Sequence, residues 1–200
     1  MKKLTFWFEF ASTYSYLSAL RIEDVAGAAG VAVEWKPFLL GPIFAAQGLT
    51  DSPFNVYPVK GEYMWRDMAR ECVKYGLPVA KQPDVFPGNG LLAARVATLG
   101  AGQDWQADFV RGVYLAQFVE GKALADARTS VDVLETLGID GAAAVERAMT
   151  DQTVKDALKA NTAAAQDAGI FGAPSFTTSD GEVFWGNDRM DDAIAWAGQR

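Results

Sequence analysis

The segment "FEFASTYSYLSAL" (Phe8–Leu20) joins a predicted strand to a predicted helix. Before the junction, large apolar residues alternate with other residues, and this period of two predicts a strand over 3–10. After the junction, apolar residues at helical spacing predict a helix from residue 14 to about residue 29, which Gly30 ends. The stretch "VAVEWKPF" (Val31–Phe38) predicts a second strand. Strand, helix and strand of these lengths indicate a βαβ unit with parallel strands and a right-handed crossover.

The centre of the chain has helical patterns, and strand patterns return only near its end. Glycines and prolines predict a loop before residue 61. We expect strands at Ser175–Thr178 and Glu182–Trp185, joined by a tight turn. The predicted helices are 61–75, 90–99, 103–120, 129–136, 140–149, 151–168 with Asp151 as N-cap, and 188–198.

With the central helices set aside, the element order is β-α-β followed by α-β-β-α. This is the order of a thioredoxin fold, so we expect an α/β protein in which a large all-α domain interrupts a thioredoxin fold. The predicted thioredoxin-like domain comprises residues 1–40 and 151–200. The predicted inserted helical domain comprises residues 41–150.

The composition restricts the possible chemistry. The chain has 200 residues, a net charge of −7, no histidine and one cysteine, Cys72. The lack of histidine excludes Ser-His-Asp and Cys-His catalysis and most zinc sites, and no metal is predicted. Cys72 shares one helix face with Met64, Met68 and Tyr75, which favours a small buried apolar residue over the alternative, a reactive thiol.

The charge pattern also restricts the partners. No cluster of basic residues suggests nucleic-acid binding, and no apolar run is long enough to span a membrane. The alternation in "MKKLTFWFEF" (residues 1–10) indicates a strand and not a signal peptide, so we expect a cytoplasmic protein.

The strand-to-helix junction is the first candidate site. Ser12-Thr13-Tyr14-Ser15 has the spacing at which disulfide oxidoreductases have Cys-x-x-Cys. Ser12 is a favourable N-cap, and that structural role alone would explain its presence. Alternatively, its hydroxyl group could donate to a ligand's thiolate near the helix N-terminus and so lower the pKa of that thiol.

Two further motifs lie near the C-terminus. Pro174 in "GIFGAPSF" precedes a predicted strand, at the place where the fold has a cis-proline, although a trans-proline can also open a strand. A cis bond would leave the Ala173 N–H and C=O free to pair with an extended peptide. Asn187 and Asp188 precede the last helix, either as N-caps or as groups that hold the polar ends of a small peptide.

Four segments together resemble one family. These are "FxFxSxYSYL" near residue 10, "PVKGEYMWRDM" (Pro58–Met68), "FGAPSF" near residue 174 and "GNDRM" near residue 188. They resemble the 2-hydroxychromene-2-carboxylate isomerases, relatives of the kappa-class glutathione transferases in the DsbA-like thioredoxin superfamily. The resemblance covers the whole chain in order. Thr13 departs from it, because many relatives have proline there, and so does the spacing of "TDSPFN".

The resemblance implies a glutathione-dependent enzyme that interconverts 2-hydroxychromene-2-carboxylate and trans-o-hydroxybenzylidenepyruvate, a step of aromatic breakdown. Glutathione would supply a thiolate that adds to the conjugated substrate, allows rotation and leaves. Ser12 would activate that thiol, so the protein needs no cysteine of its own. The other implied glutathione contacts are Asn55, Lys60, Ala173, Pro174, Asn187 and Asp188. The resemblance also implies a homodimer.

An aromatic substrate requires an apolar pocket. The candidates to line it are Trp7, Tyr14, Phe38, Phe44, Tyr63, Trp65 and Phe86, although each could instead pack in the core. Lys36, Lys60 and Arg66 are the candidates to bind a substrate carboxylate.

Two other functions remain open on the sequence. One is a glutathione transferase or peroxidase of broad specificity, and the other is a non-catalytic thioredoxin-like binding module. A dithiol oxidoreductase is not expected, because thiol–disulfide exchange needs a thiolate at the helix N-terminus and Cys72 is far from it in the sequence.

Overall fold

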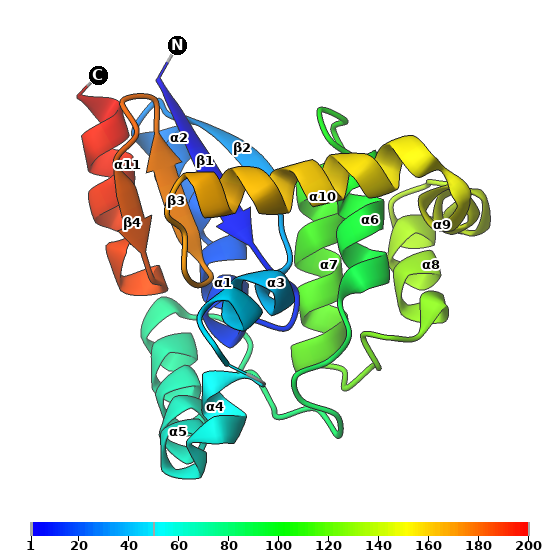
Figure 1. Ribbon diagram of the computed structural model, residues 1–200, viewed down its shortest axis with the longest axis horizontal. Coiled ribbons are helices and arrows are strands. Elements are labelled where there is room, and N and C mark those ends of the chain that lie inside the picture. Colours follow the sequence, from blue (N-terminus) through cyan, green and yellow to red (C-terminus); the bar gives the residue numbers. More distant parts are fainter. Residues whose placement is uncertain (1, 50, 200) are drawn as a thin grey trace.

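The computed structural model describes residues 2–49 and 51–199. β1 (Lys3–Phe8) lies inside a four-stranded sheet of order β2-β1-β3-β4 (Figure 1). β2 (Ala32–Pro37) is parallel to β1, whereas β3 (Ser175–Thr178) is antiparallel to β1 and forms a hairpin with β4 (Val183–Trp185). The predicted thioredoxin fold is therefore confirmed.

Alternating side chains of β1 enter two different cores. Phe6 and Phe8 belong to the larger core, with residues of α1 (Thr13–Ala19), α2 (Ile22–Ala28) and α11 (Met190–Gly198). Trp7 points to the opposite face and packs in a smaller core with Ala165 of α10 (Gln152–Asp167). Figure 1 shows α10 crossing the sheet toward the other helices. The two-residue period of the strand thus places helices on both faces of the sheet.

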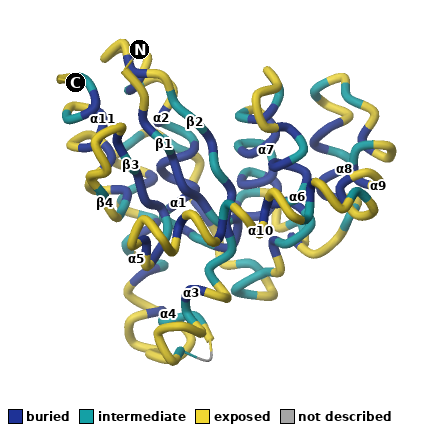
Figure 2. Tube along the Cα trace, turned by 45° about the horizontal axis from the view of Figure 1, so that its top comes forward, coloured by how far each residue is buried: buried dark blue, intermediate teal, exposed yellow. Residues whose placement is uncertain are grey.

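Between β2 and α10, the described residues form helices and connections but no strand. They are α3 (Leu40–Ala46), α4 (Pro53–Val56), α5 (Pro58–Tyr75), α6 (Leu91–Leu99), α7 (Gln106–Phe118), α8 (Ala127–Thr136) and α9 (Gly141–Thr150). The larger core continues into this part, where Phe10 lies against Phe109 and Tyr114 with ring centroids 6.4 and 5.3 Å apart. Figure 2 shows the buried residues following the strands and the inner helices. The domain boundaries near residues 40 and 151 stay a prediction.

The predicted loop before residue 61 is wrong, because it contains α3, α4 and the start of α5. Pro53 and Pro58 each occupy the first position of a helix, and Pro42 lies in the first turn of α3. Proline is favourable there because the first N–H groups of a helix have no partner within it. The prolines that we interpreted as breakers are helix starts.

Two other local predictions also change. The predicted helix over 14–29 is divided at Leu20 and Arg21, where the Arg21 N–H bonds to the Ser18 carbonyl in a tighter turn. At the C-terminus, Asn187 and Asp188 lie in a 3₁₀ turn (Asn187–Arg189), and α11 begins only after it, without a side-chain cap. The prediction that they cap this helix is therefore wrong.

Several local predictions are confirmed. Asp151 caps α10 by accepting the Thr153 N–H at 2.8 Å. The peptide bond between Ala173 and Pro174 is cis, and a second cis bond, between Phe86 and Pro87, was not predicted. Cys72 is fully buried on the inner face of α5.

We predict that Gly61→Ala destabilises the protein, because a Cβ at Gly61 would lie 2.5 Å from the backbone oxygen of Phe54. The expected loss is about 1–3 kcal/mol, the usual cost of overpacking. The measurement is the free energy of unfolding in urea. Gly27→Ala is the matched control, since no atom lies within 4 Å of a Cβ there. It should instead stabilise α2 by about 0.5–1 kcal/mol, and equal effects of both variants would contradict the prediction.

Candidate active site

A cavity of about 800 Å³ lies where the β1–α1 junction meets the loop before β3. Residues of α3, α4 and the segment 86–91 complete its wall. Its size lies within the range of sites for small ligands. The sequence-predicted residues that line it are Ser12, Tyr14, Phe44, Lys60, Tyr63, Phe86 and Ala173.

Ser12 caps α1 and contacts the loop before β3. Its backbone is extended, with φ −77° and ψ 115°, and its Oγ accepts the Ser15 N–H at 3.2 Å. The same hydroxyl group donates to the carbonyl oxygen of Ala173 at 3.0 Å. The predicted cap is confirmed, but the hydroxyl proton faces Ala173. It must turn away from that carbonyl before it can donate to a ligand.

The cis-proline loop carries N–H groups without a partner among the described residues, at Phe171, Gly172 and Ala173, and all three residues line the cavity. Among the described residues, the Ala173 N–H has no hydrogen-bond partner. The Ala173 carbonyl is not free, because it accepts the Ser12 hydroxyl proton. Our expectation of a free donor and a free acceptor at Ala173 is therefore correct for the N–H only. Pro174 supports the loop through its carbonyl, which accepts the Gly186 N–H at 2.9 Å.

Glu9 is a cavity residue that we did not select from the sequence. Its Oε2 accepts the Ala11 N–H at 2.9 Å, immediately before Ser12. Burial raises the pKa of the Glu9 carboxyl to about 7, although the hydrogen bond from the Ala11 N–H acts in the opposite direction. The sequence signal that could have identified Glu9 is its charge, because it stands between Phe8 and Phe10 next to the β1–α1 junction.

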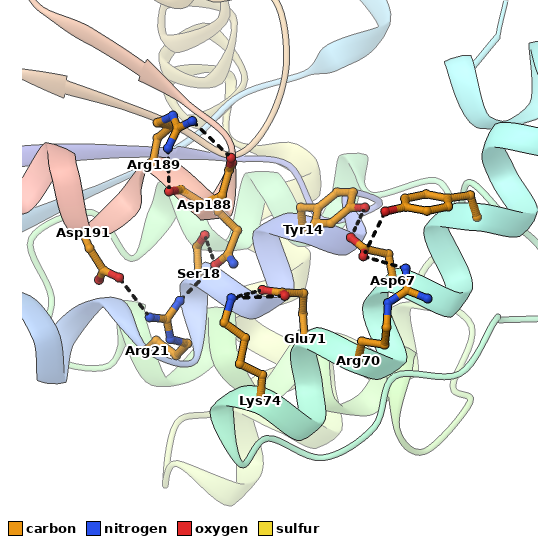
Figure 3. Close-up of polar contacts among 12 residues, drawn as sticks. Tyr14, Ser18, Arg21, Asp67, Arg70, Glu71, Lys74, Asp188, Arg189 and Asp191 are labelled. Carbon is orange, nitrogen blue, oxygen red and sulfur yellow. Dashed lines mark hydrogen bonds and ion pairs between the residues drawn. The ribbon is translucent and has the colours of Figure 1, made fainter.

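The aromatic wall is held by polar contacts between α1 and α5. The Tyr14 hydroxyl donates to Asp67 at 2.9 Å, and Asp67 also accepts from Arg70 at 2.9 Å (Figure 3). Burial and the Asp67 carboxylate raise the pKa of the Tyr14 phenol above its ordinary value. Tyr14 therefore remains a neutral phenol, and its hydroxyl proton is directed at Asp67.

Three aromatic residues of the cavity were missed by the sequence analysis. Phe54 comes from α4, whereas Phe171 and Trp185 lie beside the cis-proline loop. The rings of Phe171 and Trp185 pack with centroids 5.0 Å apart, yet each residue is about half exposed, at 48% and 50%. Large apolar rings exposed at a cavity rim are available for contact with an apolar ligand.

Several predicted pocket residues lie elsewhere. Trp7 of β1 and Phe38, the residue after β2, are buried together in the smaller core with Ala165 of α10. Trp65 packs against Phe86 in a neighbouring hollow, with ring centroids 5.1 Å apart. The prediction that Trp7, Phe38 and Trp65 line the main cavity is thus wrong.

The other predicted polar residues also lie outside the main cavity. Asn55 and Arg66 line the neighbouring hollow, and the Asn55 amide donates to Asp51 at 3.1 Å and to the Phe86 carbonyl at 3.3 Å. Lys36 pairs with Glu34 at 3.7 Å. Of the three cations proposed for a substrate carboxylate, only Lys60 faces the main cavity.

Asn187 and Asp188 lie beyond the cavity lining, at the end of the sheet. Asn187 is buried, and its Oδ1 accepts from the Ser18 hydroxyl at 3.1 Å and from Arg21 at 3.3 Å. The Asp188 side chain is 72% exposed and pairs with Arg189 at 3.8 Å (Figure 3). Of the two, only Asp188 presents its side chain to a ligand at the surface.

No group of three or more potential metal ligands occurs within 2–49 and 51–199. In the same part of the chain, no helix has both the length and the apolar character needed to cross a membrane.

Comparisons with known proteins show the family to which this chain belongs. A family model described as the DsbA-like thioredoxin domain matches residues 3–194. This chain belongs to that family. Its curated relatives include 2-hydroxychromene-2-carboxylate isomerase of Sphingobium xenophagum, 31% identical over 95% of each chain. Glutathione S-transferase kappa 2 of Caenorhabditis elegans is 23% identical. The matched region spans 94% of this chain and 88% of that relative.

The solved structures give the same placement. A solved structure of a 2-hydroxychromene-2-carboxylate isomerase superposes with a TM-score of 0.87 and 26% identity, over 98% of this chain and 95% of its own. Together with the curated relatives, it places the chain beside the 2-hydroxychromene-2-carboxylate isomerases within the DsbA-like family.

We predict that the native protein presents no reactive thiol. Cys72 is fully buried, and burial raises the pKa of its thiol, so a thiol-specific reagent should react only after unfolding. The rate of thiol labelling is measured from the absorbance of the coloured group that the reagent releases when it reacts. Ser12→Cys is the control, because a thiol at the cavity wall should react much faster than Cys72 does. Rapid labelling of the native wild-type chain would contradict the prediction.

Proposed function

We propose that this protein is a glutathione-dependent isomerase that acts on 2-hydroxychromene-2-carboxylate or a related aryl keto acid. The observation that supports this most directly is the Ser12 hydroxyl group, which lines a largely apolar cavity beside the unpartnered Ala173 N–H. The relatives named as isomerases and as a kappa-class transferase support the same reading.

The residues around the junction fit a small peptide thiol. The Ala173 N–H is the donor that an extended peptide backbone needs, in the manner of an edge strand. Ser12 would turn its hydroxyl from the Ala173 carbonyl to the sulfur and release that carbonyl for the peptide. Lys60 would attract a carboxylate of the peptide, and Asp188 an ammonium group. Asn187 would keep the turn that contains Asp188 in place through Ser18 and Arg21.

Bound glutathione would supply the sulfur nucleophile that adds to a conjugated double bond, permits rotation and leaves. The protein would contribute the donor that stabilises this sulfur as an anion, which is Ser12. It would also contribute an aromatic wall that holds the aryl group, formed by Tyr14, Phe44 and Phe54. Water would be excluded from much of this wall, and a hydrogen bond to an anion is stronger there than in water.

A direct assay separates this function from its rivals. Purified protein is mixed with glutathione and 2-hydroxychromene-2-carboxylate, and the loss of chromene absorbance is followed. Rapid conjugation of a chloro-aromatic compound with no change in the chromene would favour a broad transferase. No change of tryptophan fluorescence on titration with glutathione to millimolar concentration would favour a binding module without catalysis.

We predict that Ser12→Ala slows the isomerisation and raises the pKa of bound glutathione by about one to two units. The reason is that a hydrogen bond to a charged group is worth about 1.5–3 kcal/mol. The measurements are turnover and the ultraviolet absorbance of the thiolate against pH. Loss of the cap should also lower the unfolding free energy by about 0.5–2 kcal/mol.

The matched control is Asp140→Ala, which removes the side-chain cap of α9 at a distance from the cavity. It should reduce stability and leave turnover unchanged. Wild-type turnover in Ser12→Ala, or an equal loss of turnover in both variants, would refute the role given to Ser12.

A further inference from the structure

The proposed reaction needs a proton transfer for which Ser12 is not suited, and the inference below rests on that proposed function. The name 2-hydroxychromene-2-carboxylate places a hydroxyl group and the ring oxygen on one carbon, which makes the substrate a cyclic hemiketal. To open the ring, the hydroxyl proton must leave and the ring oxygen must gain a proton. Ser12 has a single hydroxyl proton, which the sulfur needs. A second group must therefore act as acid and base.

Five titratable side chains are found among the described residues that line the cavity: Glu9, Tyr14, Asp51, Lys60 and Tyr63. Tyr14 is excluded, because its hydroxyl donates to Asp67 and its pKa is raised. Asp51, Lys60 and Tyr63 are exposed and lie on the α4–α5 side. Glu9 alone lies at the β1–α1 junction, three residues before Ser12.

The Glu9 carboxyl is held so that one oxygen is fixed and the other has space. Oε2 accepts the Ala11 N–H at 2.9 Å, and the Ser12 N–H donates to the Glu9 backbone carbonyl at 3.0 Å. On the other side, a Cβ at Gly90 would lie 3.2 Å from Oε1 and 3.1 Å from the Cβ of Phe10. Glycine at position 90 therefore leaves Oε1 uncrowded at the cavity wall.

We propose that Glu9 is the general acid–base residue that opens and closes the hemiketal ring. The Glu9 carboxylate takes the proton of the substrate hydroxyl, and that oxygen's electron pair forms the new carbonyl bond. The bond from this carbon to the ring oxygen breaks, and its electron pair leaves on the oxygen as a phenolate. The neutral Glu9 carboxyl then protonates the phenolate, which restores the carboxylate. Ring closure follows the same steps in reverse.

The environment of Glu9 suits it both to accept a proton and to donate one. Burial raises its pKa to about 7, so both protonation states are populated near neutral pH. From α7, the neutral phenol Tyr114 donates to the Glu9 backbone carbonyl at 2.9 Å. The facing parts of α1 and of the segment 86–90 contain no charged residue. Asp51 and Lys60 are the charged groups elsewhere on the wall.

The test compares Glu9→Gln with the wild type on two substrates. The first is the chromene, and the second is cis-benzylidenepyruvate without the ortho hydroxyl group, which cannot form the ring. With glutathione present, Glu9→Gln should lower turnover of the chromene by about 10²–10⁴-fold, the usual contribution of general acid–base catalysis. Isomerisation of the ring-less compound should stay within about twofold, because it needs no proton transfer of this kind.

The pH profile gives a second result. With the wild type, the rate of chromene opening should rise with pH through about 7, because the carboxylate is the form that accepts the proton. This rise of the rate with pH should be absent when the wild type acts on the ring-less compound. It should also be absent when Glu9→Gln acts on the chromene. Glu9→Asp should restore part of the chromene activity, and Asp140→Asn should resemble the wild type, because Asp140 lies at the start of α9 and outside the cavity lining.

A readout without substrate is the pH dependence of unfolding. A carboxyl whose folded pKa is raised contributes stability that is present below its unfolded pKa, 4.5, and that is lost as pH rises through about 7. The wild type should lose stability relative to Glu9→Gln across that interval.

The inference is overturned if Glu9→Gln turns over the chromene at the wild-type rate, or if both substrates slow equally. The proposed function fails in a different way: the wild type would then bind no glutathione and isomerise neither substrate. Tryptophan fluorescence during a glutathione titration separates the two results, since Glu9→Gln should bind glutathione as the wild type does.

Discussion

β1 hydrogen-bonds to β2 along one edge and to β3 along the other, and this central position brings the two halves of the candidate site together. Because β1 and β3 are antiparallel, the residue after the end of β1 and the residue before the start of β3 lie at the same end of the sheet. Ser12 and Ala173 are 161 residues apart in the sequence, yet their hydroxyl and carbonyl groups are hydrogen-bonded at 3.0 Å. The cavity, the unpartnered Ala173 N–H and the Glu9 carboxyl group are all arranged around this contact.

The helical part of the chain supplies the opposite wall, and it does so without a separate core. Phe10 continues the apolar alternation of β1 and packs against Phe109 and Tyr114 of α7. The Tyr114 hydroxyl donates to the carbonyl of Glu9, the residue that precedes Phe10. A buried, hydrogen-bonded backbone at this point keeps the junction rigid, and rigidity is what a site needs to hold reacting groups in place.

The chemistry of the site follows from which groups are buried. A disulfide oxidoreductase needs its own thiolate at this junction, whereas here the only cysteine lies inside the core. The junction provides a hydroxyl donor and a carboxyl group of raised pKa instead. Such a pair suits a reaction in which the sulfur comes from a bound molecule, while the protein transfers protons and stabilises negative charge. The aromatic residues at the rim suit a planar, apolar substrate.

The sequence by itself determined the order of the strands, the fold, the Ser12 cap, the cis-proline position and the burial of Cys72. Each depends on periodicity, on turn chemistry or on a family resemblance that is visible along the chain. Only the tertiary structure decided what packs against each face of β1. It placed the Trp7 ring in the smaller core and not in the cavity. It also directed Asn187 onto Ser18 and Arg21, and it buried the carboxyl of Glu9. The reason is physical: local spacing fixes which side chains share a face, whereas burial and hydrogen bonding depend on what packs against that face from distant parts of the chain.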